Sequence, residues 1–108
     1  MNSKVSVIVT CYNHEKYMEE CLRSIFSQTH QDIELLVFND GSTDSSGQII
    51  ENLILESPFV ETYYFESKNR GVVTVRNDGL SKFTGDYLLF VDSDNFLEDQ
   101  HIEKLLTG

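Results

Sequence analysis

The sequence predicts an α/β fold in which helices cover a parallel β-sheet. Short apolar runs of strand length alternate with segments of helical periodicity along the 108 residues. Several of these runs are continuously apolar, as is typical of parallel strands buried on both faces. Strands joined by helices pair in parallel through right-handed connections. The length predicts a single domain, residues 1–108, with one core.

Four segments are predicted to be strands. Each is rich in apolar, aromatic or β-branched residues and is bounded by turn residues. They are Val5–Thr10, Ile33–Phe38, Val60–Phe65 and Asp86–Val91. The last contains five consecutive apolar residues, so we expect it to be buried on both faces.

Helices are predicted between these strands and after the last of them. Asn13 is expected to cap the first helix, and Thr43 or Asp44 the second. The first helical segment follows Asn13 and has its apolar positions at Tyr17, Met18, Cys21, Leu22, Ile25 and Phe26. The second contains Ile49, Ile50, Leu53 and Ile54 and stops before Pro58, the third covers about Val72–Phe83, and the last contains Ile102, Leu105 and Leu106.

Composition narrows the function. With 18 acidic and 8 basic residues the formal net charge is −10, which argues against a nucleic-acid partner because no basic face is available. No apolar stretch approaches the length of a membrane span, and no signal peptide is recognisable, so a cytoplasmic location is expected. Cys11 and Cys21 are too few for a disulfide framework and are expected to be buried or half-buried free thiols.

Polar segments follow three of the predicted strands. They are Thr10–Asn13, Asn39–Asp44 and Asp92–Asn95. Ligands bind at the carboxyl ends of the strands in open α/β sheets, and these segments converge there if their strands are neighbours. A nucleotide could then lie across them. The alternative for Asn39–Ser42 is a simple turn with a helix cap, since such residues favour those roles.

Asp92 and Asp94 are the candidate metal ligands. They flank Ser93 directly after an apolar strand, and their alternation would point both carboxylates to one side. Carboxylate pairs suit Mg²⁺ or Mn²⁺. The alternative is a solvated turn, which two close like charges disfavour.

The basic and imidazole side chains give fewer candidates. Arg76 is a candidate phosphate ligand because its planar guanidinium can donate two hydrogen bonds. Arg70 is expected to form a surface ion pair instead. His14, His30 and His101 share no ligand spacing and are interpreted as structural or exposed.

Together these segments resemble family two of the inverting nucleotide-sugar glycosyltransferases, which have the GT-A fold. The resemblance lies in their order and spacing and spans nearly the whole chain. The matching segments are Val5–Asn13, Cys21–Thr29, Glu34–Asp44, Arg76-Asn77 and Gly85–Asp94.

The resemblance implies the Rossmann-like, nucleotide-binding half of that fold and a nucleotide-sugar donor, with UDP-sugar favoured. Thr10, Tyr12 and the Asn39/Asp40 pair would contact base and ribose, with Asn13 in the same site and Arg76 near the nucleotide. Asp92 and Asp94 would form the family's Asp-x-Asp metal motif, with Asp94 as the direct ligand and Asp92 nearer the ribose or sugar. The cofactor would be Mg²⁺ or Mn²⁺.

The chain also departs from the family pattern. Thr10 replaces a frequent proline, Asn39 replaces the first of two acids, and Asn95 replaces a frequent third acid. Only 14 residues follow Asp94, whereas the family's acceptor site and catalytic carboxylate lie downstream. The catalytic residue is therefore unassigned.

The resemblance thus implies the N-terminal portion of a longer enzyme, cytoplasmic or membrane-associated. That enzyme would transfer sugar to a saccharide or glycoconjugate acceptor in polysaccharide synthesis. The 108 residues alone are expected to bind a nucleoside diphosphate weakly and to transfer no sugar. An unpaired sheet edge beside the fourth strand makes a homodimer a further expectation.

Two other classes stay open. A phosphatase of the haloacid dehalogenase type also carries Asp-x-Asp after an apolar strand, although on its first strand. A non-catalytic nucleotide-binding or assembly domain would keep the fold without the chemistry.

Overall fold

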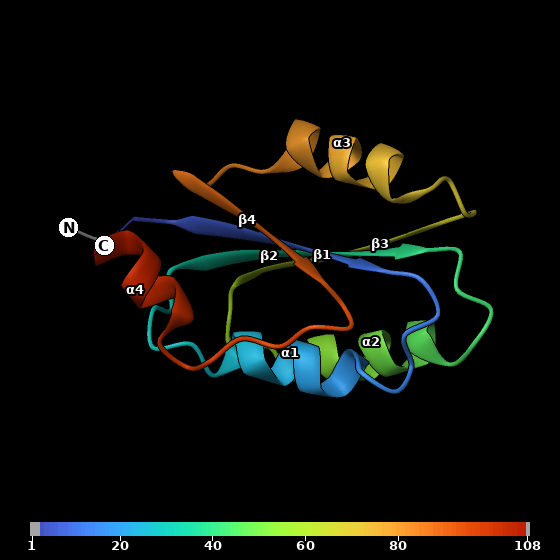
Figure 1. The fold of residues 1–108 in the computed structure, drawn as a ribbon, viewed down its shortest axis with the longest axis horizontal. Helices are drawn as coiled ribbons and strands as arrows, with labels where there is room; N and C mark the ends of the chain where they lie inside the picture. Colours follow the sequence, from blue (N-terminus) through green and yellow to red (C-terminus); the bar gives the residue numbers. More distant parts are fainter. Residues whose placement is uncertain (1–2, 108) are drawn as a thin grey trace.

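The computed structural model describes residues 3–107, in which a four-stranded sheet lies between two layers of helices (Figure 1). Helices α1 and α2 cover one face, α3 covers the other, and α4 lies beside the start of the sheet. The elements are β1 (Val5–Cys11), α1 (Met18–Phe26), β2 (Ile33–Asp40), α2 (Ser46–Ile54), β3 (Glu61–Ser67), α3 (Val72–Lys82), β4 (Tyr87–Asp92) and α4 (His101–Thr107).

The strands run in the order β3-β2-β1-β4, and every neighbouring pair is parallel. This confirms the predicted α/β fold with a parallel sheet. Thr10 in β1 aligns with Phe38 in β2 and with Asp92 in β4. The carboxyl ends of β2, β1 and β4 therefore lie side by side, as the convergence of the polar segments requires.

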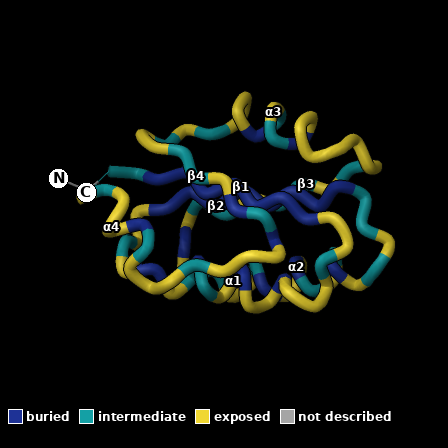
Figure 2. The backbone as a smooth tube through the Cα atoms, in the orientation of Figure 1, coloured by how far each residue is buried: buried dark blue, intermediate teal, exposed yellow. Residues whose placement is uncertain are grey.

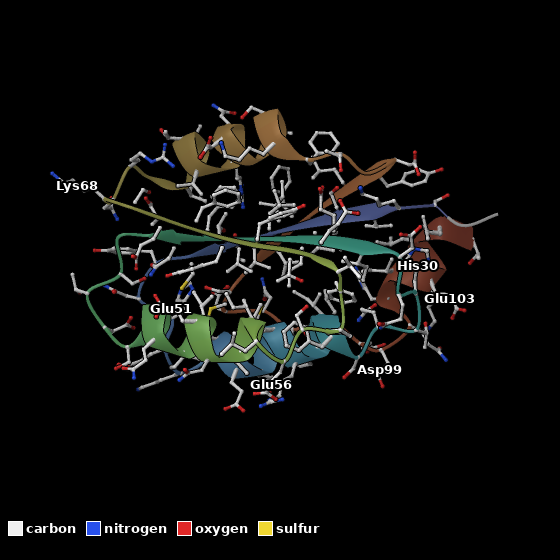
Figure 3. The ribbon with its side chains drawn as sticks, turned by 180° about the vertical axis from the view of Figure 1, so that it is seen from behind. His30, Glu51, Glu56, Lys68, Asp99 and Glu103 are labelled. Atoms are coloured by element: carbon white, nitrogen blue, oxygen red, sulfur yellow. The ribbon has the colours of Figure 1, made fainter. Side chains whose placement is uncertain are left out.

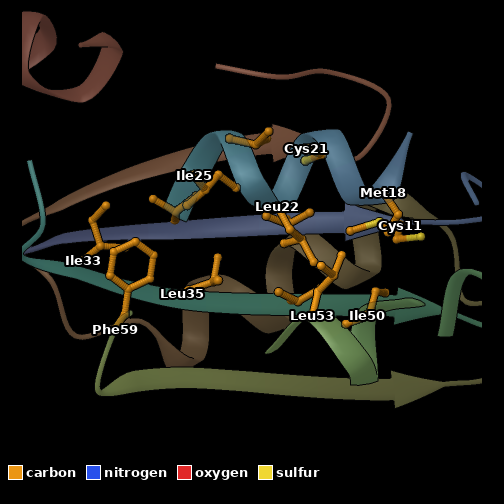
Figure 4. Close-up of a cluster of buried hydrophobic side chains, with 14 of the residues drawn as sticks. Cys11, Met18, Cys21, Leu22, Ile25, Ile33, Leu35, Ile50, Leu53 and Phe59 are labelled. Atoms are coloured by element: carbon orange, nitrogen blue, oxygen red, sulfur yellow. The ribbon is translucent and has the colours of Figure 1, made fainter. Parts of the chain in front are cut away.

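The core lies on both faces of the two central strands, and every residue of β1 and β2 is buried (Figure 2). The larger cluster fills the space between the sheet and helices α1 and α2 (Figure 4). A smaller cluster of Ile8, Leu36, Phe38 and Val75 lies under α3. The alternation of side chains along β1 and β2 supplies both clusters from the same strands.

The burial predicted for the fourth strand is wrong. Tyr87 is 55% exposed and Phe90 37% exposed, and only Val91 of β4 is fully buried. The apolar run predicted burial on both faces, but β4 lies at the sheet edge beside β1 alone. Within residues 3–107 the expected unpaired edge is present. Dimer formation through it stays a prediction.

The prediction for the start of the first helix is also wrong. Helix α1 begins at Met18 with Tyr17 as its N-cap, not at Asn13. Asn13 has a positive φ of 56° and lies in the preceding loop. The N-cap of α2 is Ser45, one residue after the predicted Asp44, whose carboxylate accepts the Ser46 N–H at 2.9 Å. These loops are set by side-chain bonds between distant segments, which spacing alone does not reveal.

Both cysteines are buried free thiols, as predicted. Burial raises the pKa of the Cys21 thiol to about 12. Because the thiolate is the reactive form, we expect Cys21 at pH 8 to react with iodoacetamide roughly a thousandfold more slowly in the folded than in the unfolded protein. Peptide mass spectrometry with a urea-unfolded control measures the ratio. Equal labelling rates in the two states would contradict this burial.

None of the helices in residues 3–107 is long and apolar enough to cross a membrane.

Candidate functional site

A cavity of about 320 Å³ opens at the carboxyl ends of the strands. Its walls come from the loop after β1, the ends of β2 and β4, the loop before α3 and the first turn of α3. They are formed by Thr10, Cys11, Tyr12, His14, Asp40, Asn69, Gly71, Val72, Val75, Asp92 and Asp94. Ligands of open parallel sheets bind at this place in the fold.

Five of the candidate site residues from the sequence line this cavity. They are Thr10, Tyr12, Asp40, Asp92 and Asp94. Asn13, Asn39 and Arg76 are not among the lining residues, and of these three side chains only that of Arg76 bonds a residue of the cavity wall, Asp92, in the described part of the chain. Tyr12 is 46% exposed, so its ring is available to a ligand.

Asp92 is held in place by two donors on one of its oxygens. The Thr10 hydroxyl donates to Oδ1 at 3.0 Å, across the aligned pair of β1 and β4. The Arg76 guanidinium donates to the same oxygen at 3.1 Å and lies over the Phe90 ring. Within residues 3–107, Oδ2 of Asp92 accepts no hydrogen bond, so it remains free toward a ligand.

Asp94 lies in the turn after β4 and is exposed. Its carboxylate makes no hydrogen bond to the described part of the chain. Between the two acids, Ser93 is fully buried, and its N–H donates to the Thr10 carbonyl at 3.0 Å. The turn is therefore fixed through Ser93 and leaves the Asp94 carboxylate at the cavity mouth.

Asp40 shapes the opposite wall. Its Oδ1 accepts the N–H of Arg70 at 2.7 Å, and its Oδ2 accepts the N–H of Gly71 at 3.0 Å. A carboxylate at this position also interacts favourably with the positive end of the α3 dipole. Asp40 thereby holds the loop that carries Asn69 and Gly71 against the cavity.

Asn39 and Asn13 are both engaged in bonds between loops. Asn39 is buried, accepts the Ser42 N–H at 3.1 Å and donates to the Tyr64 hydroxyl at 3.0 Å. The side-chain oxygen of Asn13 accepts the Thr43 N–H at 2.8 Å. These two side chains fix the shape of the loop after β2, and their proposed contacts to a nucleotide stay predictions.

Sequence reasoning missed several residues of the cavity wall, notably His14, Asn69 and Val72. Asn69 and Val72 reach the site only because Asp40 binds the loop before α3, and no local pattern signals this. The ion pair expected for Arg70 is confirmed, with Asp78 at 3.3 Å. His30 is structural as expected, since its Nε2 bonds the Ser3 carbonyl at 2.7 Å.

The acidic side chains at the cavity suit a divalent cation whose coordination shell is completed by the phosphates of a bound substrate and by water. In residues 3–107 no group of three or more His, Cys, Asp or Glu side chains could enclose a metal by itself. Mg²⁺ is commonly held by one or two carboxylates together with substrate phosphates and waters. Oδ2 of Asp92 and the carboxylate of Asp94 are the oxygens that would provide that share of the ligands if a cation were bound.

Fold and cavity together define an α/β domain with a polar cavity at the carboxyl ends of a parallel sheet. The chain belongs to the glycosyl transferase family 2, whose profile matches residues 6–107. It is 42% identical over 105 residues to the glycosyltransferase GlyA of Streptococcus pneumoniae. The aligned region covers 97% of this chain and 15% of GlyA. An uncharacterised glycosyltransferase of Haemophilus influenzae is 41% identical, over 94% of this chain and 40% of its own length.

Solved structures agree with this assignment. S. aureus TarS residues 1–349 in complex with UDP-GlcNAc superposes with a TM-score of 0.83 at 33% identity, covering 96% of this chain and 30% of that chain. The mannosyltransferase PcManGT from Pyrobaculum calidifontis, in complex with GDP-Man and Mn²⁺, gives 0.79 at 27% identity, covering 89% and 29%. The chain thus spans less than half the length of these relatives. The family assignment excludes the haloacid dehalogenase alternative.

Proposed function

We propose that this chain forms the donor-binding part of a glycosyltransferase and holds a nucleoside diphosphate sugar, with uridine as the favoured base, together with Mg²⁺ or Mn²⁺. The observation that carries the proposal is one cavity lined by Tyr12, Asp40, Asp92 and Asp94 at the carboxyl ends of adjacent parallel strands. The resemblance to TarS with UDP-GlcNAc and to PcManGT with GDP-Man and Mn²⁺ supports it.

The cavity offers two chemically different walls. The exposed Tyr12 ring and the polar groups of Thr10 and Asp40 suit a base and ribose. At the other wall, Asp92 and Asp94 would hold the cation, which when bound would neutralise the diphosphate and stabilise it as a leaving group. Arg76 keeps Asp92 in place, and its Nε has no hydrogen-bond partner in residues 3–107.

The rest of the reaction belongs to the longer protein in this proposal. An inverting transfer needs a general base that deprotonates the acceptor hydroxyl, and none is assigned here. We extend the proposal to a saccharide or glycoconjugate acceptor, to polysaccharide synthesis and to a cytoplasmic site of action.

Replacing Asp94 with asparagine tests the metal site. We expect the variant to lose at least about tenfold in affinity for UDP in the presence of Mn²⁺, because a charged ligand of the cation is removed. In the absence of metal its UDP affinity should match that of the wild type. Isothermal titration calorimetry with UDP, with and without MnCl₂, measures both.

The matched control is Asp99→Asn. Asp99 is exposed and lies at one end of the sheet (Figure 3). Lys68, which adjoins the cavity loop, lies at the other end. The control removes the same charge from the same segment, so it should bind like the wild type. Equal Mn²⁺-dependent affinities for Asp94→Asn and Asp99→Asn would refute the metal site and favour a non-catalytic assembly domain.

A further inference from the structure

His14 contacts the turn that carries the two acids. It lies in the loop between β1 and α1, is half-buried and lines the cavity. Its Nδ1 shares a hydrogen bond of 2.5 Å with the hydroxyl of Ser93. The edge of its ring packs against Tyr17, with the two ring centroids 6.1 Å apart.

The backbone holds this histidine in a fixed position. Its N–H donates to the Ser46 hydroxyl at 3.1 Å, and its carbonyl accepts the N–H groups of Tyr17 and Met18. Because Ser46 is fully buried at the start of α2, His14 is tied to two helices. The imidazole is therefore a rigid support rather than a mobile surface group.

Ser93 is the point at which a contact can steer both acids. It is the residue between Asp92 and Asp94, and its backbone already bonds β1. Asp92 has its own supports in Thr10 and Arg76. Asp94 has none among residues 3–107, so the orientation of its carboxylate depends on the turn.

The far side of the same segment is held by α1 and by the turn that follows it. The fully buried Gln28 donates to the Glu98 carbonyl at 2.7 Å and accepts the Ile102 N–H at 3.0 Å. The Ser24 hydroxyl accepts the Leu97 N–H at 2.9 Å. Among residues 93–96, which lie between β4 and these contacts, the bond of Ser93 to His14 is the only side-chain hydrogen bond within the described residues.

We infer that His14 is a positioning residue, which orients the Asp92-Ser93-Asp94 turn through Ser93 and thereby sets the affinity of the site for its cation. The inference rests on the proposed function for its metal part. A preorganised ligand avoids the cost of ordering when the cation binds. Loss of one hydrogen bond of ordinary strength weakens such a site by about three- to tenfold.

Three variants test this role. His14→Leu removes the bond and keeps an apolar group against Tyr17. Ser93→Ala removes the same bond from the other partner. His14→Asn retains a polar atom on Cγ, where Nδ1 is attached, and serves as the conservative rescue.

The first readout needs no ligand. Hydrogen exchange of the Asn95 amide, which bonds the Asp92 carbonyl at 2.9 Å, reports on the turn. We expect exchange about three- to tenfold faster in His14→Leu and Ser93→Ala, and near the wild-type rate in His14→Asn. The second readout is the ratio of UDP affinities with and without MnCl₂, which should fall by the same factor in the first two variants.

The matched control is His30→Leu. His30 also makes one hydrogen bond from its ring, but at the other end of the sheet, beside Glu103 and Asp99 (Figure 3). This variant should leave both readouts unchanged. Unaltered Asn95 exchange in both His14→Leu and Ser93→Ala overturns the inference. If the UDP affinity of the wild type were the same with and without Mn²⁺, the proposed function would be overturned instead. The exchange rates would still decide the role of His14.

Discussion

Replacing Gly41 with alanine should destabilise the fold by about 3 kcal/mol and weaken nucleotide binding. Gly41 has a φ of +73°, a backbone conformation in which an alanine is strained. A Cβ there would also lie 2.5 Å from the backbone nitrogen of Asn69. Neither backbone can yield without moving the loop that Asp40 holds against the cavity. Urea unfolding followed by circular dichroism measures the stability, and calorimetry with UDP measures the binding.

Gly71→Ala is the matched control. Gly71 also has a positive φ, of +89°, but a Cβ there meets no atom within 4 Å. The control therefore carries the strain without the collision, and about 1 kcal/mol of destabilisation is expected. If both alanine variants lost the same stability, the close packing of Gly41 on the Asn69 backbone would be refuted.

Replacing Glu34 with alanine should cost about 3 kcal/mol, because it leaves the buried Ser6 hydroxyl and the two donors of Thr84 without their acceptor. Glu34 is 2% exposed. One oxygen accepts the Ser6 hydroxyl at 2.7 Å and the Thr84 N–H at 2.8 Å, and the other accepts the Thr84 hydroxyl at 2.8 Å. This network fastens the connection between α3 and β4 to the middle of the sheet. Urea unfolding at pH 7 measures the loss.

The pH dependence of stability separates the contribution of the Glu34 charge from that of the side chain's shape, when the wild type is compared with Glu34→Gln. Burial opposes the charge of Glu34, but the hydrogen bonds from Ser6 and Thr84 outweigh it and lower its pKa below 4.5. A lowered folded-state pKa adds stability above the unfolded value, and that stability is lost as pH falls through the folded value. The gap between wild type and Glu34→Gln should therefore shrink below about pH 4.5.

Glu61→Ala is the control for the loss of an acid. Glu61 is the register partner of Glu34 on β3 and forms a partly exposed ion pair with Lys4 at 2.9 Å. Such pairs contribute roughly 0–1 kcal/mol. A loss at Glu34 no larger than that at Glu61 would show that the buried network adds little.

The parallel sheet and the meeting of its polar loops could be predicted because their signals are local. The apolar runs of β1 and β2 mark strands buried on both faces, and the helical spacing between them requires parallel pairing. Asp92 and Asp94 follow such a run, so the edge at which they lie was also predictable. Strand order then decided that this edge forms one cavity.

What the sequence did not reveal depends on contacts between distant segments. The run in β4 looks like that of a strand buried on both faces, yet its place at the edge leaves Tyr87 and Phe90 exposed. His14 has no ligand spacing, and it contacts the turn that carries the two acids only through Ser93. Likewise Asn69 lines the cavity because a carboxylate 29 residues earlier in the chain holds its loop.

The central position of β1 has a consequence for how this domain acquires its structure. Thr10 and its β4 partner Asp92 are separated by 82 residues, and no strand pair in residues 3–107 is a hairpin. Contacts of such long range slow folding, because loop closure must precede them. During synthesis on the ribosome, β1 emerges 82 residues before β4, so one edge of β1 stays unpaired until β4 has emerged. We therefore expect this unpaired edge of β1 to need protection by a chaperone early in synthesis.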